Sequence, residues 1–283
     1  MRLTAGLGFK SEHFDEALAS RAAGLWFEVH PENYMVEGGP RLAMLEALRR
    51  EHPVALHGVG LSLAADAEPD VRHLARLKTL VDRISPFLVS EHLAWSAWRG
   101  SYNPDLLPFP RTHAALDRVA ANVEQTQEAL GRAILIENPS LYMPLEGHEL
   151  SEVDFLAALV RKAGCGLLVD VNNVFVSARN LGFSAEDYLD AVPASAIGEI
   201  HLAGHTPDAR HGASLLIDTH GAPVAEPVWR LYERLIGRVG LKPTLIERDE
   251  DIPAFSDLMA ERDRAANTLL RQTVPHGREA VHV

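Results

Sequence analysis

The sequence predicts an α/β protein, specifically a (β/α)8 TIM barrel that forms a single domain. Short apolar runs alternate with longer amphipathic segments along the chain. The runs are rich in Val, Ile, Leu and Phe, as are parallel strands that are buried on both faces. The length of 283 residues suits one barrel of this kind.

Eight apolar runs of five to nine residues are the predicted strands. Their ranges are 5–9, 25–30, 53–61, 87–95, 133–138, 166–173, 197–205 and 243–249. Between them, apolar residues recur at intervals of three and four, which is typical of helices that cover a sheet. These predicted helices span 11–20, 41–52, 68–84, 111–131, 151–164, 184–192, 227–240 and 252–271. Strict alternation favours a closed barrel over an open doubly wound sheet.

Residues with known capping preferences mark several helix ends. Ser151 and Ser184 stand where an N-cap is expected, and Gly131 and Gly164 stand where a helix is expected to stop. No G-x-G-x-x-G fingerprint follows the first strand, because "GLGFK", which overlaps its end, does not match that pattern. A dinucleotide-binding fold is therefore disfavoured.

Three stretches, 96–110, around 176–183 and 206–221, lack helical periodicity, and we predict them to be long loops. Long loops at one end of a barrel usually carry function. We assign residues 1–272 to the barrel domain and predict that residues 273–283 form a disordered tail.

Composition excludes several classes of protein. The net charge of −12 argues against a nucleic acid partner. Cys165 is the only cysteine, so the chain has no disulfide framework, and we predict a buried, inert thiol. No apolar run is long enough for a membrane span, and the first residues do not resemble a signal peptide. We expect a cytoplasmic protein without a membrane partner.

Polar residues gather at the carboxyl ends of strands three to eight. In a barrel these ends face one rim, so the side chains should converge on one mouth. The residues are His57, Glu91, His92, Glu137, Asn138, Asp170, Asn172, Asn173, His201, His205, Asp218, His220, Glu247 and Asp249.

Imidazoles and carboxylates with an occasional amide form a ligand set for first-row metals. Without a cation, several carboxylates in one mouth would repel one another and raise each other's pKa values. A multinuclear cluster avoids this, with Glu137 or Glu247 able to bridge two ions. Because no thiolate is available, Fe, Mn, Zn or Co is expected rather than Cu(I) or an iron–sulfur cluster.

Taken singly, each of these residues is more often structural, as a helix cap or a histidine bonded to backbone. The joint pattern is what predicts a metal centre. A further set could support the ligands or contact substrate, and the sequence leaves that choice open. It comprises Glu28, His30, Glu32, Asn33, Glu91 and Asp249. By strand alternation, Asp170 and Asn172 share one side, and we expect Asn172 to hold the turn.

Nine blocks, in order, resemble the multinuclear non-heme iron dependent oxidative enzymes, and in particular their short bufferin-type branch. The resemblance covers about residues 5 to 265. The blocks are "GLGFK", "WFEVHPENYM", "LHGVGLSL", "LVSEHLAW", "LIENPS", "LLVDVNNVFVSARN", "GEIHLAGH", "LIDTHG" and "TLIERD".

The resemblance implies a TIM barrel with two or three iron ions, Fe(II) or Fe(III), at its mouth. It also implies dioxygen as co-substrate and oxidative modification of cysteines in a ribosomally made precursor peptide, with oxazolone or thiooxazole products. A separate partner protein would recognise the leader of that cysteine-containing precursor.

Carried over motif by motif, the resemblance gives three groups of ligands. His57, His92 and Glu137 would serve one side of the cluster. Glu137 would bridge to a second ion, and a third ion would lie in the loops. The second ion would be held by Asp170, His201 and Glu247, and the third by Asn173, His205, Asp218 and His220. Glu137, Asp170 and Glu247 are the implied catalytic residues.

Two rival functions fit the same residue types. A zinc or manganese barrel could be a sugar isomerase or an endonuclease, since such barrels also gather His, Glu and Asp at the mouth. The acidic composition disfavours DNA. The other rival is a protein that binds metal without turnover.

Overall fold

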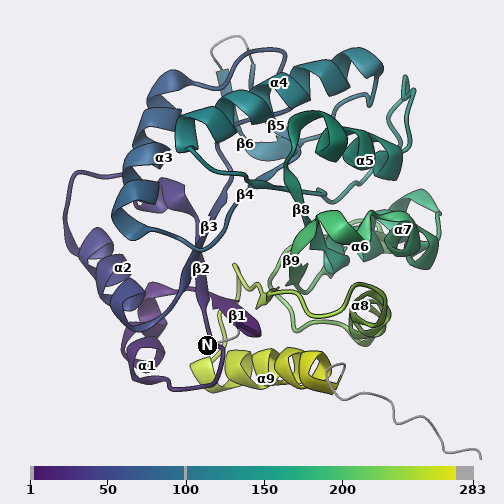
Figure 1. Cartoon of the computed structure of the whole chain (residues 1–283). Coiled ribbons are helices and arrows are strands. Elements are labelled where there is room, and N and C mark those ends of the chain that lie inside the picture. Colours follow the sequence, from purple (N-terminus) through teal and green to yellow (C-terminus); the bar gives the residue numbers. More distant parts are fainter. Residues whose placement is uncertain (1–2, 99–100, 272–283) are drawn as a thin grey trace, which may run out of the picture.

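A closed parallel barrel forms the centre of the molecule, as predicted. The structure is a computed structural model and describes residues 3–98 and 101–271. Within them, eight parallel strands pair in the order β1-β12-β9-β8-β7-β4-β3-β2 (Figure 1). Their bounds are β1 Ala5–Gly8, β2 Phe27–Val29, β3 Val54–Gly58, β4 Val89–His92, β7 Leu135–Glu137, β8 Gly166–Asp170, β9 Ile197–Leu202 and β12 Thr244–Ile246. Every strand that the sequence predicts is present.

Helices surround the barrel, and each of the predicted helices is present (Figure 1). The helix caps are those that the sequence predicts. Ser151 and Ser184 each accept a backbone N–H three residues later, and Gly131 and Gly164 end α4 and α5 in the left-handed conformation. The helices are α1 Phe14–Ala19, α2 Pro40–Glu51, α3 Val71–Ile84, α4 His113–Leu130, α5 Glu152–Ala163, α6 Val171–Leu181, α7 Ala185–Ala191, α8 Glu226–Val239 and α9 Phe255–Arg271, with short 3-10 turns at Ser11–His13, Pro31–Asn33 and Ala194–Ala196.

The predicted loop around residues 176–183 is wrong, because most of that stretch belongs to α6. This helix starts directly after β8, where an Asp170 carboxylate oxygen accepts the backbone N–H of Asn173 at 2.6 Å. That bond is an N-cap, which makes an abrupt start possible. Val171, Val174 and Ala178 bury one face of the helix. The two asparagines that disguised the periodicity are also buried.

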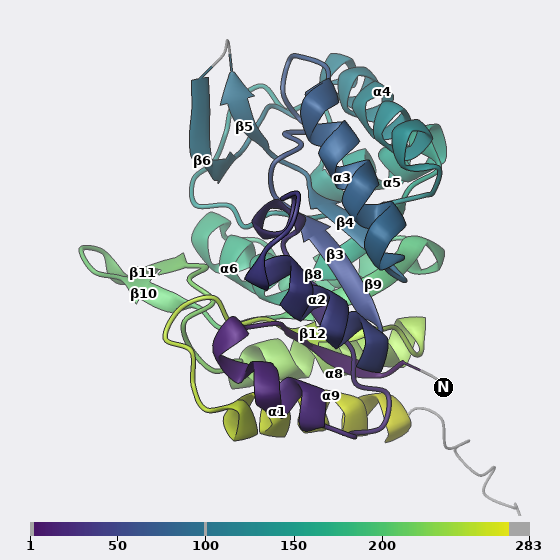
Figure 2. The ribbon, with the colours of Figure 1, turned by 90° about the vertical axis from the view of Figure 1, so that its left-hand side faces the viewer.

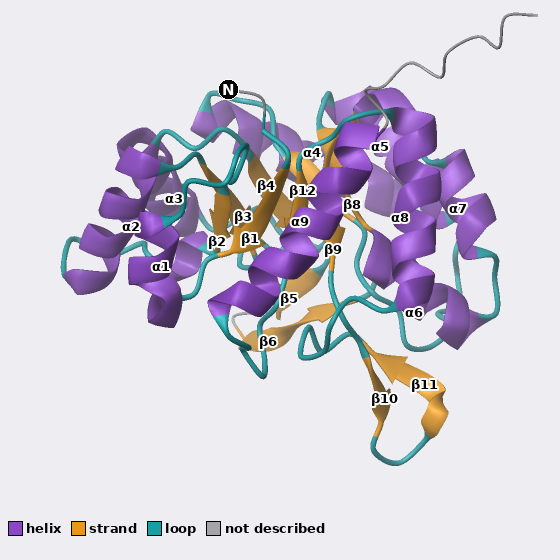
Figure 3. Ribbon diagram, turned by 90° about the horizontal axis from the view of Figure 1, so that it is seen from below, coloured by secondary structure: helices purple, strands orange, loops and turns teal. Residues whose placement is uncertain are grey.

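The other two predicted loops contain β-hairpins. β5 (Trp95–Trp98) pairs with β6 (Ser101–Leu107), and β10 (Thr206–Asp208) pairs with β11 (Gly212–Ile217). Both hairpins extend from the same end of the barrel (Figures 2 and 3). That end follows β4 and β9, so it is the carboxyl end of the strands. The predicted tail, 273–283, lies outside the described residues.

The lumen of the barrel is apolar at one end and polar at the other. Trp26, Ala55 and Leu245 form a small cluster of their own, separate from the large core between strands and helices. A Cβ at Gly6 would overlap the Trp26 ring, so this glycine leaves room for the indole. We call the cluster of Trp26, Ala55 and Leu245 the apolar floor of the lumen. Trp26, directly before β2, and Glu28 are two residues apart along the chain and point to the same face, so Glu28 lies one layer above this floor.

No helix among residues 3–98 and 101–271 combines the length and the apolar character that crossing a membrane requires.

Gly204 supports the segment that carries the loop residues of the mouth. Its carbonyl accepts the His220 backbone N–H at 3.0 Å, and a Cβ there would overlap the Ala222 carbonyl. We expect Gly204→Ala to destabilise the protein by about 1–3 kcal/mol in urea unfolding, the usual cost of overpacking. Gly237→Ala is the control. A Cβ there meets nothing within 4 Å in α8, so stability should rise by about 0.5–1 kcal/mol. Equal changes in stability for Gly204→Ala and Gly237→Ala would contradict the close packing of Gly204 against Ala222.

Candidate metal centre

Three side chains from neighbouring strands converge at the mouth, and we call them the upper triad: His57 on β3, His92 on β4 and Glu137 on β7. Glu137 Oε2 lies 3.1 Å from His57 Nε2 and 3.0 Å from His92 Nε2. The two Nε2 atoms are 3.2 Å apart. Ligands bound at about 2.1 Å to one metal ion are about 3.0 Å apart at octahedral angles and about 3.4 Å apart at tetrahedral angles.

The other ring nitrogens fix which tautomers are present. His92 Nδ1 lies 2.9 Å from the Gly58 carbonyl, which can only accept, so Nδ1 carries the hydrogen. His57 Nδ1 lies 2.8 Å from Ser90 Oγ. The Ser90 O–H donates to the Leu56 carbonyl at 3.5 Å, so His57 Nδ1 is the donor to Ser90. Both Nε2 lone pairs therefore face each other and a carboxylate. Three acceptors at this spacing require a cation between them, either a proton or a metal ion.

In the metal-free protein, the pKa values show where protons take that place. Burial and the nearby His92 lower the pKa of His57 to about 4. Burial also opposes the charge of His92, but Glu137 outweighs it and raises the His92 pKa well above its usual value. Burial would raise the pKa of Glu137, yet His92 and His57 lower it instead. A proton shared around His92 therefore stands in for a metal ion.

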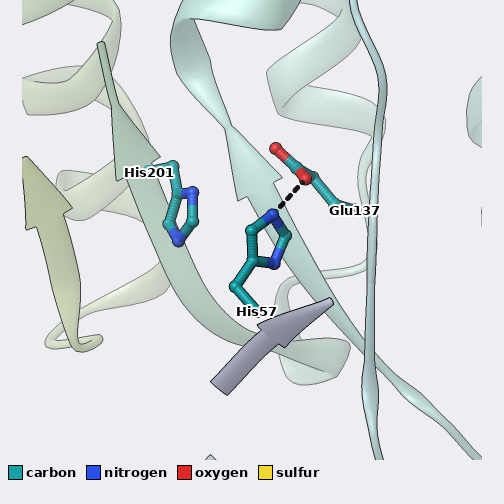
Figure 4. A group of neighbouring side chains, drawn as sticks. All are labelled: His57, Glu137 and His201. Carbon is teal, nitrogen blue, oxygen red and sulfur yellow. Dashed lines mark ion pairs between the residues drawn. The ribbon is translucent and has the colours of Figure 1, made fainter. Parts of the chain in front are cut away.

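A second set of ligand atoms lies on the next strands of the mouth. Asp170, His220 and Glu247 offer atoms within 4.8 Å of one another. Glu247 Oε2 accepts from His201 Nδ1 at 3.2 Å. Figure 4 shows His57 directed at Glu137, whereas His201 stands on its own strand without an ion pair to either. Burial, Asp218 and Glu137 together raise the pKa of Asp170 well above its usual value.

The loop after β9 adds Asp218 and His220. His220 Nε2 lies 2.9 Å from Asp218 Oδ1, and His220 Nδ1 lies 2.9 Å from Asp249 Oδ2. His220 has a φ of 50°, which is uncommon outside glycine and often marks functional positions. The Asn172 amide donates to Asp218 at 2.7 Å, and its oxygen accepts from His205 Nδ1 at 2.7 Å. We expected Asn172 to hold the turn after its own strand, but it lies in the first turn of α6 and holds the loop after β9 instead.

Asn173 and His205 make contacts outside the third group that the family resemblance implies, while Asn173 Oδ1 has no hydrogen-bond partner among residues 3–98 and 101–271. The Asn173 amide donates to Glu137 Oε1 at 3.3 Å and to the Asn138 carbonyl at 3.1 Å, so it lies beside the upper triad. His205 is only half-buried and reaches Asp218 through Asn172. Within the predicted third group, Asp218 and His220 are the pair in direct contact.

Two of the residues that the sequence left open hold the backbone of the loop after β3. Glu32 accepts the N–H groups of Val59 and Gly60 at 3.0 and 2.9 Å. Glu91 accepts the N–H of Leu61 at 3.2 Å. These carboxylates therefore support the segment that carries the Gly58 carbonyl, the partner of His92.

A cavity of about 250 Å³ opens beside the mouth between β1, β2 and β12. The remaining open residues, Glu28, His30, Asn33 and Asp249, line it together with Glu247 and Lys10. Lys10 donates to Asp249 at 2.7 Å. Lys10, which directly follows the first predicted strand, was not among the predicted site residues. Glu199 was not predicted either, although strand alternation places it on the same face of β9 as His201.

The donor set fits a metal cluster. Within residues 3–98 and 101–271, Asp170 Oδ2 is a buried oxygen without a hydrogen-bond partner. Glu137 Oε2 and His220 Nε2 are also buried, and they face other members of the site at 3.0 and 2.9 Å without a well-directed hydrogen bond. Buried acceptors without donors are costly, and coordination to a cation removes that cost. All are nitrogen or oxygen atoms. Burial raises the pKa of Cys165 to about 11, so this thiol remains protonated and inert, as predicted.

Fold and site together define a (β/α)8 barrel with a metal-binding mouth. The chain belongs to the MbnB/TglH/ChrH family of RiPP precursor modification enzymes, whose family model matches residues 4–270. RiPPs are ribosomally synthesised, post-translationally modified peptides. The family expectation from the sequence is confirmed.

Curated relatives match along nearly the whole chain, and solved structures share its fold. A UPF0276 protein of Caulobacter vibrioides strain NA1000 is 68% identical over 100% of both chains. Another, from Paraburkholderia phytofirmans, is 46% identical over 98% of this chain and 91% of its own. Endonuclease IV from Thermus thermophilus is 17% identical with a TM-score of 0.57, covering 95% of this chain and 99% of its own. A 3-keto-D-glucoside 4-epimerase from E. coli is 14% identical with a TM-score of 0.55, covering 96% and 99%. The two solved structures share the fold alone.

Asp170→Asn should separate metal binding from helix capping. Asparagine also caps helices, so α6 should persist, while the charged ligand oxygen is lost. We expect the affinity for divalent metal to fall at least about 100-fold. Loss of a residue that only hydrogen-bonds to a metal ligand costs about 10–100-fold, so a larger loss indicates a direct ligand. Competition with a chelator of known affinity measures the dissociation constant of the metal. Asp70→Asn, at the exposed N-cap of α3, is the control and should bind metal normally. Similar losses in both variants would contradict a ligand role.

Stability of the metal-free protein should fall as the pH rises above about 6.5. The pKa values of His92, His201 and His220 are raised in the folded state. Their stabilisation is complete below the unfolded value of about 6.5 and is lost as the pH rises through the folded values. Bound metal replaces these protons, so the loaded protein should change little. Thermal unfolding with chelator and with Zn(II) tests this, and a metal-free midpoint that rises with pH would contradict it.

Proposed function

We propose that this protein uses iron and dioxygen to oxidise cysteine residues of a ribosomally made precursor peptide. The family is one of RiPP precursor modification enzymes, which supports a peptide substrate. The proposal goes further than the family in naming iron, dioxygen and cysteine as the target. It also includes a partner protein that recognises the leader peptide, and a cytoplasmic location.

The observation that carries the proposal is the convergence of buried imidazole and carboxylate atoms at the mouth. His57, His92 and Glu137 would hold one iron, while Asp170 and Glu247, with Asp218 and His220 from the loop, would hold the remainder. When bound, the iron would activate dioxygen and bind the substrate sulfur as thiolate. This ligand set, free of thiolate, suits iron among the first-row metals.

The cavity beside the mouth offers room for the reacting residue. At about 250 Å³ it lies below the 300–1,000 Å³ of sites that enclose whole small molecules. It therefore suits one or two residues of a peptide whose remainder lies outside. Phe9, Val29 and Met44 form apolar lining that excludes water, and Tyr34 and His30 add polar groups.

The chain's own residues would orient and protect the site. The His30 Nδ1–H donates to the His57 carbonyl at 3.0 Å, which leaves Nε2 available to the cavity. Burial raises the pKa of Tyr34, so its hydroxyl stays protonated near neutral pH and can donate to a substrate carbonyl. The Lys10–Asp249–His220 chain ties the end of β1 to the loop after β9. It keeps the mouth in one arrangement as substrate enters.

The test begins with anaerobic reconstitution with Fe(II). A cysteine-bearing precursor and its partner protein are added, dioxygen is admitted, and the peptide is analysed by mass spectrometry. We expect a mass change that maps to cysteine and needs both iron and oxygen. A precursor with cysteine replaced by alanine should remain unchanged, as should the normal precursor with the Glu137→Gln enzyme.

An unchanged precursor in the presence of partner, oxygen and fully bound iron would refute the proposal. Turnover of a sugar or of abasic DNA by the zinc or manganese form without oxygen would favour the rival barrel enzymes. Tight metal binding without any turnover would favour the non-catalytic rival.

A further inference from the structure

The cavity beside the mouth has a buried end and an exposed end. Glu28 and Glu247, at the buried end, are 4% and 6% exposed. We call the exposed part of the lining the rim, and it consists of Ser11, Glu12, Asn33, Arg41 and Asp249. The cavity has room for one or two residues, so a peptide whose reacting residue fills the buried end places a neighbouring residue at the rim. The groups of the rim then determine which neighbouring residues are accepted.

Arg41 is a cation of the rim that is free to meet a charge on a ligand. It makes no hydrogen bond or ion pair with residues 3–98 and 101–271. Lys10, the other cation that lines the cavity, is held by Asp249 at 2.7 Å. Burial raises the pKa of Tyr34, and the charge of Arg41 partly opposes that rise, so the guanidinium lies near this hydroxyl.

The stability of α2 does not explain the position of Arg41. It is the second residue of this helix, whose first turn contains no acidic residue. A cation in the first turn is unfavourable, because the positive end of the helix dipole lies there. Arg50, in the last turn, stands where the dipole favours a cation. The position of Arg41 therefore indicates a role outside its own helix.

We propose that Arg41 is a specificity-determining residue, whose guanidinium binds a carboxylate next to the reacting residue of the substrate peptide. The forked N–H groups of arginine match the two oxygens of a carboxylate. The Asn33 amide and the Tyr34 hydroxyl line the same cavity and can donate further hydrogen bonds. Glu12 repels a carboxylate elsewhere on the rim, so the preference is confined to the neighbourhood of Arg41.

This inference rests on the proposed function in one respect, which is that the substrate is a peptide. The carboxylate can belong to an Asp or Glu side chain on either side of the reacting residue. It can also be the end of the peptide, when the reacting residue is the last one. These sources present the same two oxygens to Arg41, and synthetic peptides distinguish them.

The test is peptide binding to the Zn(II)-loaded full-length protein, without iron and therefore without turnover. The probes are Ac-Gly-Glu-Cys-Gly-NH2, Ac-Gly-Cys-Glu-Gly-NH2 and Ac-Gly-Gly-Cys with a free carboxyl end. Each has an uncharged counterpart, with Gln for Glu or with an amidated end. Titrations followed by NMR give the dissociation constants. We expect at least one carboxylate peptide to bind about 10-fold more tightly than its counterpart, as a charge-assisted hydrogen bond at a partly exposed site would give.

Arg41→Gln should abolish this preference. Arg50→Gln is the matched control and should keep it, because it removes the same charge from the other end of α2, away from the cavity. Three results would overturn the proposal: equal binding of charged and uncharged peptides to the wild type, no binding of any carboxylate peptide, or an equal loss of preference in both variants.

Peptides with serine in place of cysteine separate this inference from the proposed function. If they bind as tightly as the cysteine peptides and their carboxylate preference still requires Arg41, the cysteine target is wrong and the role of Arg41 stands. If the cysteine peptides bind more tightly but show no carboxylate preference, the role of Arg41 is wrong and the cysteine target stands.

Discussion

Buried acceptors that lack donors are the constraint on which the mouth of this barrel depends. In the upper triad, two imidazole lone pairs and a carboxylate oxygen converge within 3.0 to 3.2 Å. No rearrangement of hydrogens within the triad satisfies all three, because the outer nitrogens are committed to Ser90 and Gly58. The site is stable only with a positive charge at its centre. Protons can fill that role, and a bound metal ion would replace them.

The fold places that charge requirement where it can be used. Parallel strands bring His57, His92, Glu137 and Asp170 to one rim, and the apolar floor around Trp26 closes the lumen below. Asp170 combines two roles, since one oxygen caps α6 while the other points into the mouth without a partner among the described residues. The abrupt strand-to-helix junction thus fixes a ligand without a flexible loop. The hairpins after β4 and β9 extend from this same end, beside the place where a peptide would enter.

Much of the arrangement follows from sequence pattern, because a barrel sends every strand end to one rim. Apolar runs located the strands, and the polar residues that follow them located the mouth. The pattern failed where tertiary contacts override it. Buried Asn172 and Asn173 disguised the start of α6, and the hairpins lack the alternation of a half-buried strand.

The most direct test of the central claim is anomalous X-ray scattering at the iron edge, on crystals grown without oxygen from Fe(II)-loaded protein. The account predicts a peak between His57, His92 and Glu137, and at least one more beside Asp170 and Glu247. Loaded crystals in which those positions carry no anomalous signal, with iron bound elsewhere or absent, would contradict it.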